Sequence, residues 1–139
     1  MKKFFEDLII YENENFDLHQ DWYIPIPWFF ILAAKNLENR SVSDFTEEEA
    51  YNFIDITRKI RKIMKEKLLI DDVYFFQNED TEHWFHLWIF PRLDWMEKFW
   101  RKIESVRSIM NYAKENMFLE ENIKKVKEYV EIAKEEFKK

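Results

Sequence analysis

The residues best suited to chemistry are the three histidines, His19, His83 and His86. The last two open the segment HWFHLWIFPR, which is dense in aromatic side chains. Side chains alternate between the two faces of a strand, so a strand through this segment places Trp84, His86 and Trp88 on one face. Near neutral pH an imidazole serves as a nucleophile, a general base or a metal ligand. The segment therefore predicts one imidazole between two indoles.

A plainer interpretation of His86 is a packed core histidine whose ring nitrogen bonds a backbone carbonyl, and the residue pattern by itself favours this alternative. A metal site is not expected, because His83 and His86 diverge on a strand. The sequence also has no cysteine and no H-x-H or E-x-x-H spacing. We expect neither a bound metal nor a cofactor.

Glycine and cysteine are both absent from the 139 residues. Without glycine the chain cannot form a P-loop, a G-x-G-x-x-G dinucleotide turn or an Asn-Gly hairpin. Without cysteine it has no disulfide and no thiol nucleophile. Several common ways of holding phosphates are therefore excluded.

Charge and hydropathy exclude further classes. The formal net charge is -6 at pH 7, which argues against a nucleic-acid-binding face. No uncharged run approaches the ~18 residues of a membrane span, and the N-terminus does not look like a signal peptide. We expect a cytoplasmic protein that binds neither nucleic acid nor membrane.

Five strands are predicted from short apolar runs bounded by turn residues. The first two form a hairpin around the Glu12-Asn13-Glu14-Asn15 turn. The third has no polar alternation, which suits a strand covered on both faces. A short polar loop joins the last two, which are therefore expected to be antiparallel. The strands are expected at residues 8–11, 16–19, 27–34, 73–77 and 84–90.

A long amphipathic helix is predicted between the third and fourth strands. Thr46, with Glu49 three residues later, forms a capping box that marks the helix start. Its second half is rich in Lys and Arg, which complement the negative end of the helix dipole and are expected to be solvated. The apolar side is expected at Ala50, Phe53, Ile54, Thr57, Ile60 and Met64.

The last part of the chain is predicted to be helical, with a break around residues 116–122. One helix face is expected at Val106, Ile109, Met110, Ala113 and Met117, and another at Ile123, Val126, Val130, Ala133 and Phe137. The element order predicts an α+β fold, with an antiparallel sheet, one long crossover helix and C-terminal helices. The crossover helix should cover one face of the sheet and leave the other open for a ligand or partner.

The stretch from about Leu8 to Arg92 resembles the histidine triad (HIT) family of nucleotidyl hydrolases and transferases. That family has a strand with three alternating histidines, followed by apolar residues and often by Pro-Arg. Aligning Ile89-Phe90-Pro91-Arg92 with the end of this motif places Trp84, His86 and Trp88 on the three histidine positions. The triad is thus degenerate, and only its middle member is kept. In the family this residue attacks the α-phosphorus and forms a nucleotidyl-imidazole intermediate.

The resemblance implies a HIT-like domain over residues 1–95, and we expect residues 96–139 to be a helical extension packed on it. It also implies roles for individual residues. Asp21 takes the position that hydrogen-bonds the ribose hydroxyls, and Trp22 the position that packs on the base. Asn78 takes the position of an asparagine that contacts the phosphates or the leaving group. The expected catalytic residues are His86 and Asn78, and the expected substrate-binding residues are Asp21, Trp22, His83, Trp84 and Trp88.

The chain departs from the family at the phosphates. A Gly-rich loop normally precedes the triad, but here only Asp80-Thr81-Glu82-His83 is present, with two carboxylates that would repel a polyphosphate. Indoles can replace histidine as donors but cannot shuttle a proton. Regular pleating points His83 away from His86, so His83 would serve as a general acid only if the backbone turned it back.

The resemblance favours a HIT-like hydrolase of dinucleoside polyphosphates, such as diadenosine tetraphosphate, or of nucleoside phosphoramidates. Two alternatives are a nucleotide-binding module without turnover and an interaction protein whose aromatic residues form a dimer core. HIT-like proteins are commonly homodimers. The segment Tyr74-Phe75-Phe76 and the long helix are the surfaces expected to join two copies. The expected partners are thus a nucleotide or dinucleotide ligand and a second copy of the chain.

Overall fold

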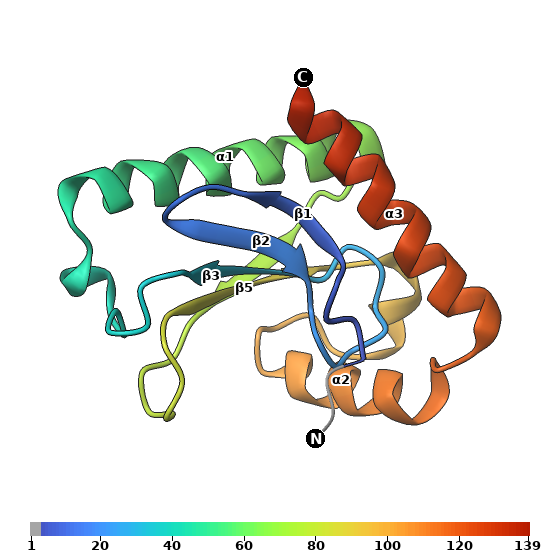
Figure 1. Cartoon of the computed structure of the whole chain (residues 1–139). Helices are drawn as coiled ribbons and strands as arrows, with labels where there is room; N and C mark the ends of the chain where they lie inside the picture. Colours follow the sequence, from blue (N-terminus) through green and yellow to red (C-terminus); the bar gives the residue numbers. More distant parts are fainter. Residues whose placement is uncertain (1–3) are drawn as a thin grey trace.

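The computed structural model describes residues 4–139, in which a five-stranded sheet lies between helices (Figure 1). The strands are β1 (Ile9–Glu12), β2 (Phe16–Gln20), β3 (Phe30–Ala34), β4 (Val73–Phe76) and β5 (His86–Pro91). The α-helices are α1 (Glu47–Leu68), α2 (Ser105–Asn116) and α3 (Glu120–Lys138). Two short 3-10 helices are η1 (Val42–Asp44) and η2 (Asp94–Lys98).

The strands pair in the order β1-β2-β3-β5-β4, and each pair is antiparallel. Helix α1 carries the chain from β3 across to β4, and β5 then pairs between those two strands. The predicted α+β class, antiparallel sheet and long crossover helix are therefore confirmed.

The predicted hairpin is closed by an asparagine. The side-chain oxygen of Asn13 accepts hydrogen bonds from the backbone N–H groups of Asn15 and Phe16, at 2.8 and 2.9 Å. Such a side chain stands in for a backbone acceptor and fixes the turn without a glycine.

Two strands, β3 and β5, begin at least two residues later than predicted. Trp28 has a φ of 72°, in the left-handed region, so the run from Pro27 is interrupted and β3 begins at Phe30. The backbone N–H of Phe85 donates to the carbonyl of Asn39 at 2.8 Å, and β5 begins one residue later, at His86. Its regular strand geometry is therefore shorter than the aromatic run suggested.

The capping box at the start of α1 is confirmed. The Thr46 hydroxyl accepts from the Glu49 N–H at 3.1 Å, and the Glu49 carboxylate accepts from the Thr46 N–H at 2.7 Å. The predicted apolar side is partly wrong, because Ala50 is exposed and Ile54 is 48% exposed. The buried apolar residues of α1 are Ile56, Ile60, Ile63 and Met64.

Helices α1 and α3 cover one face of the sheet, and α2 packs against the other (Figure 1). On the first face, Ile60 of α1 and Val130 of α3 belong to one apolar core with the strands. On the second face, Ile109 of α2 packs in a smaller core with Phe29 and Phe90. Most residues of the predicted apolar faces of the two C-terminal helices are buried, whereas Met117 and Ile123 are only partly buried. None of the helices within residues 4–139 is long and apolar enough to cross a membrane.

Candidate functional site

A cavity of about 170 Å³ lies on the α2 side of the sheet, over β3 and β5. Trp88 lies opposite Ile31 of β3 in the strand register, and both line this cavity. Its wall consists of Asp21, Trp22, Tyr23, Ile31, Thr81, His83, Trp84, His86 and Trp88. The fold thus brings together six of the seven residues expected from the sequence, and Asn78 is the exception.

The tautomer of His86 follows from its backbone contact. Its ring is buried, and Nδ1 lies 2.7 Å from the carbonyl oxygen of Trp84. A carbonyl oxygen only accepts, so Nδ1 carries the proton and the neutral ring has its lone pair on Nε2. The ring centroids of Trp84 and Trp88 lie 5.0 and 5.8 Å from that of His86. This is the backbone bond expected of a packed histidine, and it also leaves Nε2 in the nucleophilic form.

The structure places His83 beside His86, where regular pleating would have separated them. Residues 81–83 form a bend before β5 begins, and the His83 N–H donates to the Thr81 hydroxyl at 3.2 Å. The two imidazole centroids are 6.3 Å apart, and both side chains line the cavity. His83 is exposed, and it lines the same cavity as His86.

Trp22 lies between two imidazoles. Its ring stacks on His19 at 4.8 Å with an interplanar angle of 14°, and meets His86 edge-on at 5.2 Å and 82°. His19 is itself buried, and its Nδ1 bonds the carbonyl of Gln20 at 2.8 Å. No role in the site was predicted for His19. His19 lies opposite Ile31 in the strand register, and Ile31 lies opposite Trp88, so all three side chains are on the face of the sheet that carries the cavity. This register identifies His19 as a neighbour of the site.

Asp21 is buried at the end of β2, where its carboxylate organises the following loop. Oδ2 accepts from the N–H groups of Tyr23 and Ile24, at 2.9 and 2.7 Å. Burial raises the pKa of Asp21 to about 6, although these bonds, a bond from the Trp88 side chain and the charge of Lys114 each lower it. A carboxylate has about four acceptor positions, so further acceptor capacity remains for a ligand hydroxyl.

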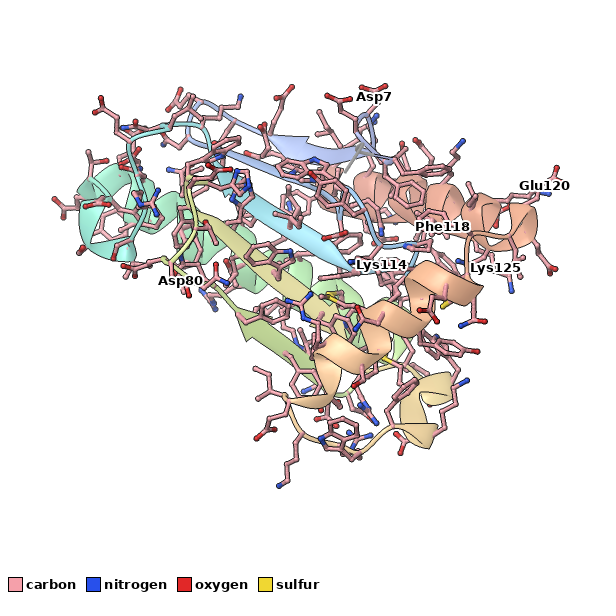
Figure 2. The ribbon with its side chains drawn as sticks, turned by 90° about the horizontal axis from the view of Figure 1, so that it is seen from below. Asp7, Asp80, Lys114, Phe118, Glu120 and Lys125 are labelled. Atoms are coloured by element: carbon pink, nitrogen blue, oxygen red, sulfur yellow. The ribbon has the colours of Figure 1, made fainter. Side chains whose placement is uncertain are left out.

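A second cavity, of about 400 Å³, adjoins the first and shares Asp21, Tyr23 and Trp88 with it. Asn78 lies here, together with Ile24, Phe76, Arg107, Met110 and Lys114. In Figure 2 the labelled Lys114 lies where α2 meets the strands. Arg107 and Lys114 were not predicted as site residues, because nothing in the local sequence pattern says which end of the sheet α2 covers.

Arg40 holds the acidic loop between β4 and β5 in place. Its guanidinium donates to the carbonyl of Glu79 at 2.9 Å and also to the carbonyl of Thr81. The side chains of Glu79, Asp80 and Glu82 are exposed, and within the described part of the chain none of them lines either cavity. Figure 2 shows Asp80 on the left of the view, away from Lys114 near its centre.

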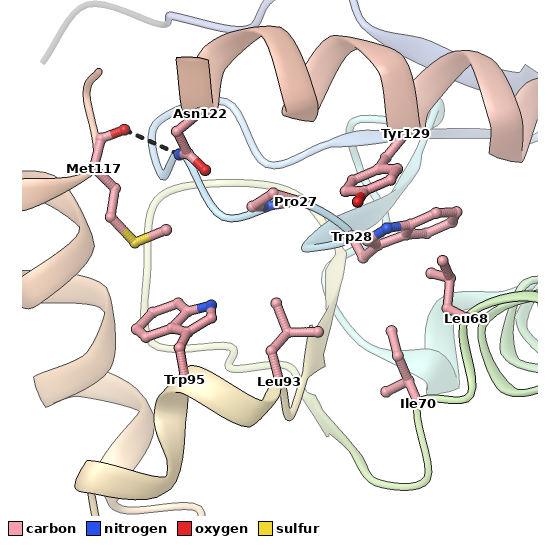
Figure 3. Close-up of a pocket in the computed structure, with 9 residues that line it drawn as sticks. All are labelled: Pro27, Trp28, Leu68, Ile70, Leu93, Trp95, Met117, Asn122 and Tyr129. Atoms are coloured by element: carbon pink, nitrogen blue, oxygen red, sulfur yellow. Dashed lines mark hydrogen bonds between the residues drawn. The ribbon is translucent and has the colours of Figure 1, made fainter. Parts of the chain in front are cut away.

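A third cavity, of about 320 Å³, lies between the β2–β3 loop, the end of α1, η2 and the start of α3 (Figure 3). Its wall consists of Pro27, Trp28, Leu68, Ile70, Leu93, Trp95, Met117, Asn122 and Tyr129. The Asn122 amide donates to the carbonyls of Pro25 and Met117, at 2.6 and 3.0 Å. No histidine or carboxylate is among these lining residues of the described chain, so this apolar space offers no nucleophile or strong base.

The His86 cavity and its neighbour therefore form the candidate site. They combine a buried histidine whose neutral ring has its lone pair on Nε2, a second imidazole, a buried carboxylate, an aromatic wall and two cations. Within residues 4–139 no three histidine or acidic side chains are placed together to hold a metal ion.

No family model matches the sequence, and no curated protein matches it. Solved structures do share its fold. A zinc-bound histidine triad family protein from Mycobacterium smegmatis has a TM-score of 0.57 at 18% identity, covering 90% of this chain and 84% of that chain. A Hit-like protein from Bartonella henselae, described as involved in cell-cycle regulation and solved with an unknown ligand, has a TM-score of 0.55 at 21% identity, covering 87% and 85%. The C. elegans NitFhit protein has a TM-score of 0.54 at 13% identity.

The chain therefore has the fold of HIT proteins. It spans 26% of NitFhit, but more than four fifths of the two bacterial proteins. Residues 96–139 make up about a third of the sequence, so a match over 90% of the chain must include most of them. The likeness in structure thus extends beyond Arg92, where the resemblance in sequence ends.

Proposed function

We propose that this HIT-fold chain is a cytoplasmic nucleotide hydrolase that acts through a covalent nucleotidyl-histidine at His86. One observation carries the proposal: the Nδ1 hydrogen bond to the Trp84 carbonyl leaves the lone pair on Nε2 of a buried ring, and His86 lines a cavity. A buried carboxylate and three indoles surround the same cavity, and these groups suit a ribose and a base.

The reaction proceeds in two displacements. Nε2 of His86 attacks the α-phosphorus, a P–N bond forms, and the bond from phosphorus to the leaving phosphate or amine breaks. Water then attacks the same phosphorus, the P–N bond breaks, and the nucleoside monophosphate leaves. A leaving phosphate needs little protonation, whereas a leaving amine needs a proton. We assign this proton to His83, whose ring centroid lies 6.3 Å from that of His86.

The remaining groups hold the substrate. Asp21 accepts hydrogen bonds from the ribose hydroxyls, and the Trp22 ring, fixed by its stack on His19, packs on the base. Asn78 contacts the phosphate that lies in the second cavity, which Trp88 also lines. We propose dinucleoside polyphosphates and nucleoside phosphoramidates as the substrate classes.

A turnover panel tests this assignment. Mononucleotides, diadenosine tetraphosphate and an adenosine phosphoramidate are incubated with the wild type and with His86→Ala, and products are separated by chromatography. We expect hydrolysis by the wild type and none by the variant, with circular dichroism showing that both are folded. Equal hydrolysis by the two proteins would contradict the proposal.

A binding module without turnover is the second candidate. The observation in its favour is that indoles flank His86 in the strand, and an indole can donate but not accept a proton. A thermal shift with nucleotides in the absence of turnover would support this function. If nucleotides cause neither a thermal shift nor turnover, the result would instead support an interaction protein.

We also propose that the chain forms a homodimer. β4 is the outer strand at one edge of the sheet, and its Phe75 is 41% exposed. Tyr51 and Ile54 are exposed on α1. Light scattering at micromolar concentration should give the mass of two chains, and Phe75→Lys should give that of one, because a charge on the joined edge opposes pairing. A monomeric wild type would exclude the dimer.

A further inference from the structure

The cavity next to His86 carries two cations that the proposed chemistry does not use. Arg107 and Lys114 are seven residues apart on α2, so they lie on the same side of the helix and about 10.5 Å apart along its axis. Met110 lies between them, and all three line the cavity. A stripe of α2 thus presents two positive charges to one space.

Neither cation has a carboxylate within ion-pair distance, although the charge of Lys114 acts on the buried Asp21 in the same cavity wall. Among residues 4–139, Arg107 and Lys114 take part in none of the ion pairs within 4.0 Å. Arg101, a few residues earlier, behaves differently, since its guanidinium bridges Asp72 and Glu97. Arg107 and Lys114 therefore outnumber Asp21, the one carboxylate among the described residues that line this cavity, and give the cavity an excess of positive charge that suits an anion.

The opposite wall is suited to the same kind of ligand. Asn78 of the β4–β5 loop offers amide donors, and Tyr23 offers a hydroxyl. The carboxylates of that loop line neither cavity among the described residues. Because Trp88 is common to both cavities, an anion held here lies next to the nucleophilic histidine.

We propose that Arg107 and Lys114 form a polyphosphate subsite on α2. Phosphoryl groups beyond the one that faces His86 lie along this stripe. Because the chain has no glycine, it has no Gly-rich loop to bind phosphates through backbone N–H groups, and the two side chains bind them through positive charge instead. The placement of the phosphate chain next to His86 rests on the proposed function, whereas the anion subsite itself stands on the cavity and its charges.

The subsite makes the chain selective for the length of the phosphate chain. A nucleoside triphosphate or a dinucleoside polyphosphate reaches both cations, and a monophosphate facing His86 reaches neither. Each charge-assisted contact is worth about a tenfold change in affinity or more. ATP should therefore bind more tightly than AMP, and its advantage should shrink as salt is added.

Calorimetry with inorganic triphosphate, ATP, AMP and citrate tests the subsite. The proteins are the wild type, Arg107→Gln, Lys114→Gln and the double variant. Lys102→Gln is the matched control, because it removes the same charge from an exposed residue outside both cavities. Thermal unfolding checks that each variant is folded.

We expect the Kd for triphosphate to rise about tenfold in each single variant and further in the double variant, with Lys102→Gln unchanged. If triphosphate binds the double variant as it binds the wild type, the subsite is overturned while His86 chemistry stands. If citrate binds as tightly as triphosphate, a phosphate-selective subsite is overturned. If triphosphate binding depends on the two cations but no nucleotide binds, the subsite is supported and the proposed function fails. If nothing binds the wild type, both proposals fail.

Discussion

The Nδ1–H of His86 donates a 2.7 Å hydrogen bond to the carbonyl oxygen of Trp84, two residues earlier in the chain. The acceptor is a backbone atom, so it does not depend on which side chain stands at position 84. The bond fixes both the tautomer and the plane of the ring. The neutral His86 ring therefore has its lone pair on Nε2, although Trp84 and Trp88 lie on either side of it.

Substitutions of the two cavity histidines should have graded effects on turnover. His86→Ala removes the atom that forms the covalent bond, so kcat/KM should fall by about 10⁴-fold or more. His83→Ala removes only a proton donor, so the loss should be about 10²-fold with a phosphoramidate and smaller with a polyphosphate. Initial rates with both substrates measure this, and mass spectrometry of the denatured wild type should show an acid-labile nucleotidyl adduct. A larger loss for His83→Ala would invert the assigned roles.

Asp21→Asn should change how stability depends on pH. Burial raises the pKa of Asp21 from 3.8 to about 6 in the folded chain, so the folded state holds the proton more tightly than the unfolded state does. The free energy of unfolding should therefore fall as the pH rises from ~4 to ~6, by about 3 kcal/mol in all, and then level off. In the variant this component is absent. Urea unfolding at several pH values gives the difference between the two proteins, and parallel curves would refute the shift.

Two left-handed residues give a test of backbone strain. Leu69 ends α1 with a φ of 57° and is 79% exposed, so Leu69→Gly should raise the free energy of unfolding by about 1 kcal/mol. Trp28 has a φ of 72° but is only 2% exposed, so Trp28→Gly relieves the same strain and loses a buried ring, for a net loss of about 3 kcal/mol. Denaturant midpoints distinguish the two. Destabilisation by Leu69→Gly would show that its side chain packs.

Arg92 should not tolerate replacement by lysine. It is buried, and its guanidinium donates to the carbonyls of Met96 and Phe99, at 2.8 and 2.9 Å, and to the Ser105 hydroxyl at 3.3 Å. An ammonium cannot reproduce this fork, so Arg92→Lys should cost about 3 kcal/mol. Arg101→Lys is the control, because its ion pairs are exposed and should change stability by less than about 1 kcal/mol. If Arg92→Lys and Arg101→Lys change the free energy of unfolding equally, the buried hydrogen bonds of Arg92 add nothing to stability.

Much of the fold could be predicted from local pattern alone. Turn residues, alternation and the capping box at Thr46 act over a few positions, so the strands, the long helix and the helical C-terminal part could be identified. Strand starts were less predictable, because the left-handed Trp28 and the bond from Phe85 to Asn39 depend on tertiary structure. The exposed Ile54 shows the same limit, since an apolar residue need not be buried.

The candidate site was predictable where it lies on strands. Alternation placed Trp84, His86 and Trp88 together, and the resemblance supplied Asp21 and Trp22. The other residues of the site lie on segments whose orientation cannot be predicted from the local sequence pattern. A bend turns His83 into the cavity, and the docking of a later helix brings up Arg107 and Lys114.

The placement of the tryptophans allows ligand binding to be followed by intrinsic fluorescence. Three of the six, Trp22, Trp84 and Trp88, line the His86 cavity, Trp28 and Trp95 line the apolar cavity, and Trp100 is exposed. A base stacked on the first group should quench its emission, and a ligand in the apolar cavity should alter the second group alone. Occupancy of either space can therefore be followed by intrinsic fluorescence, without a label, in the wild-type chain.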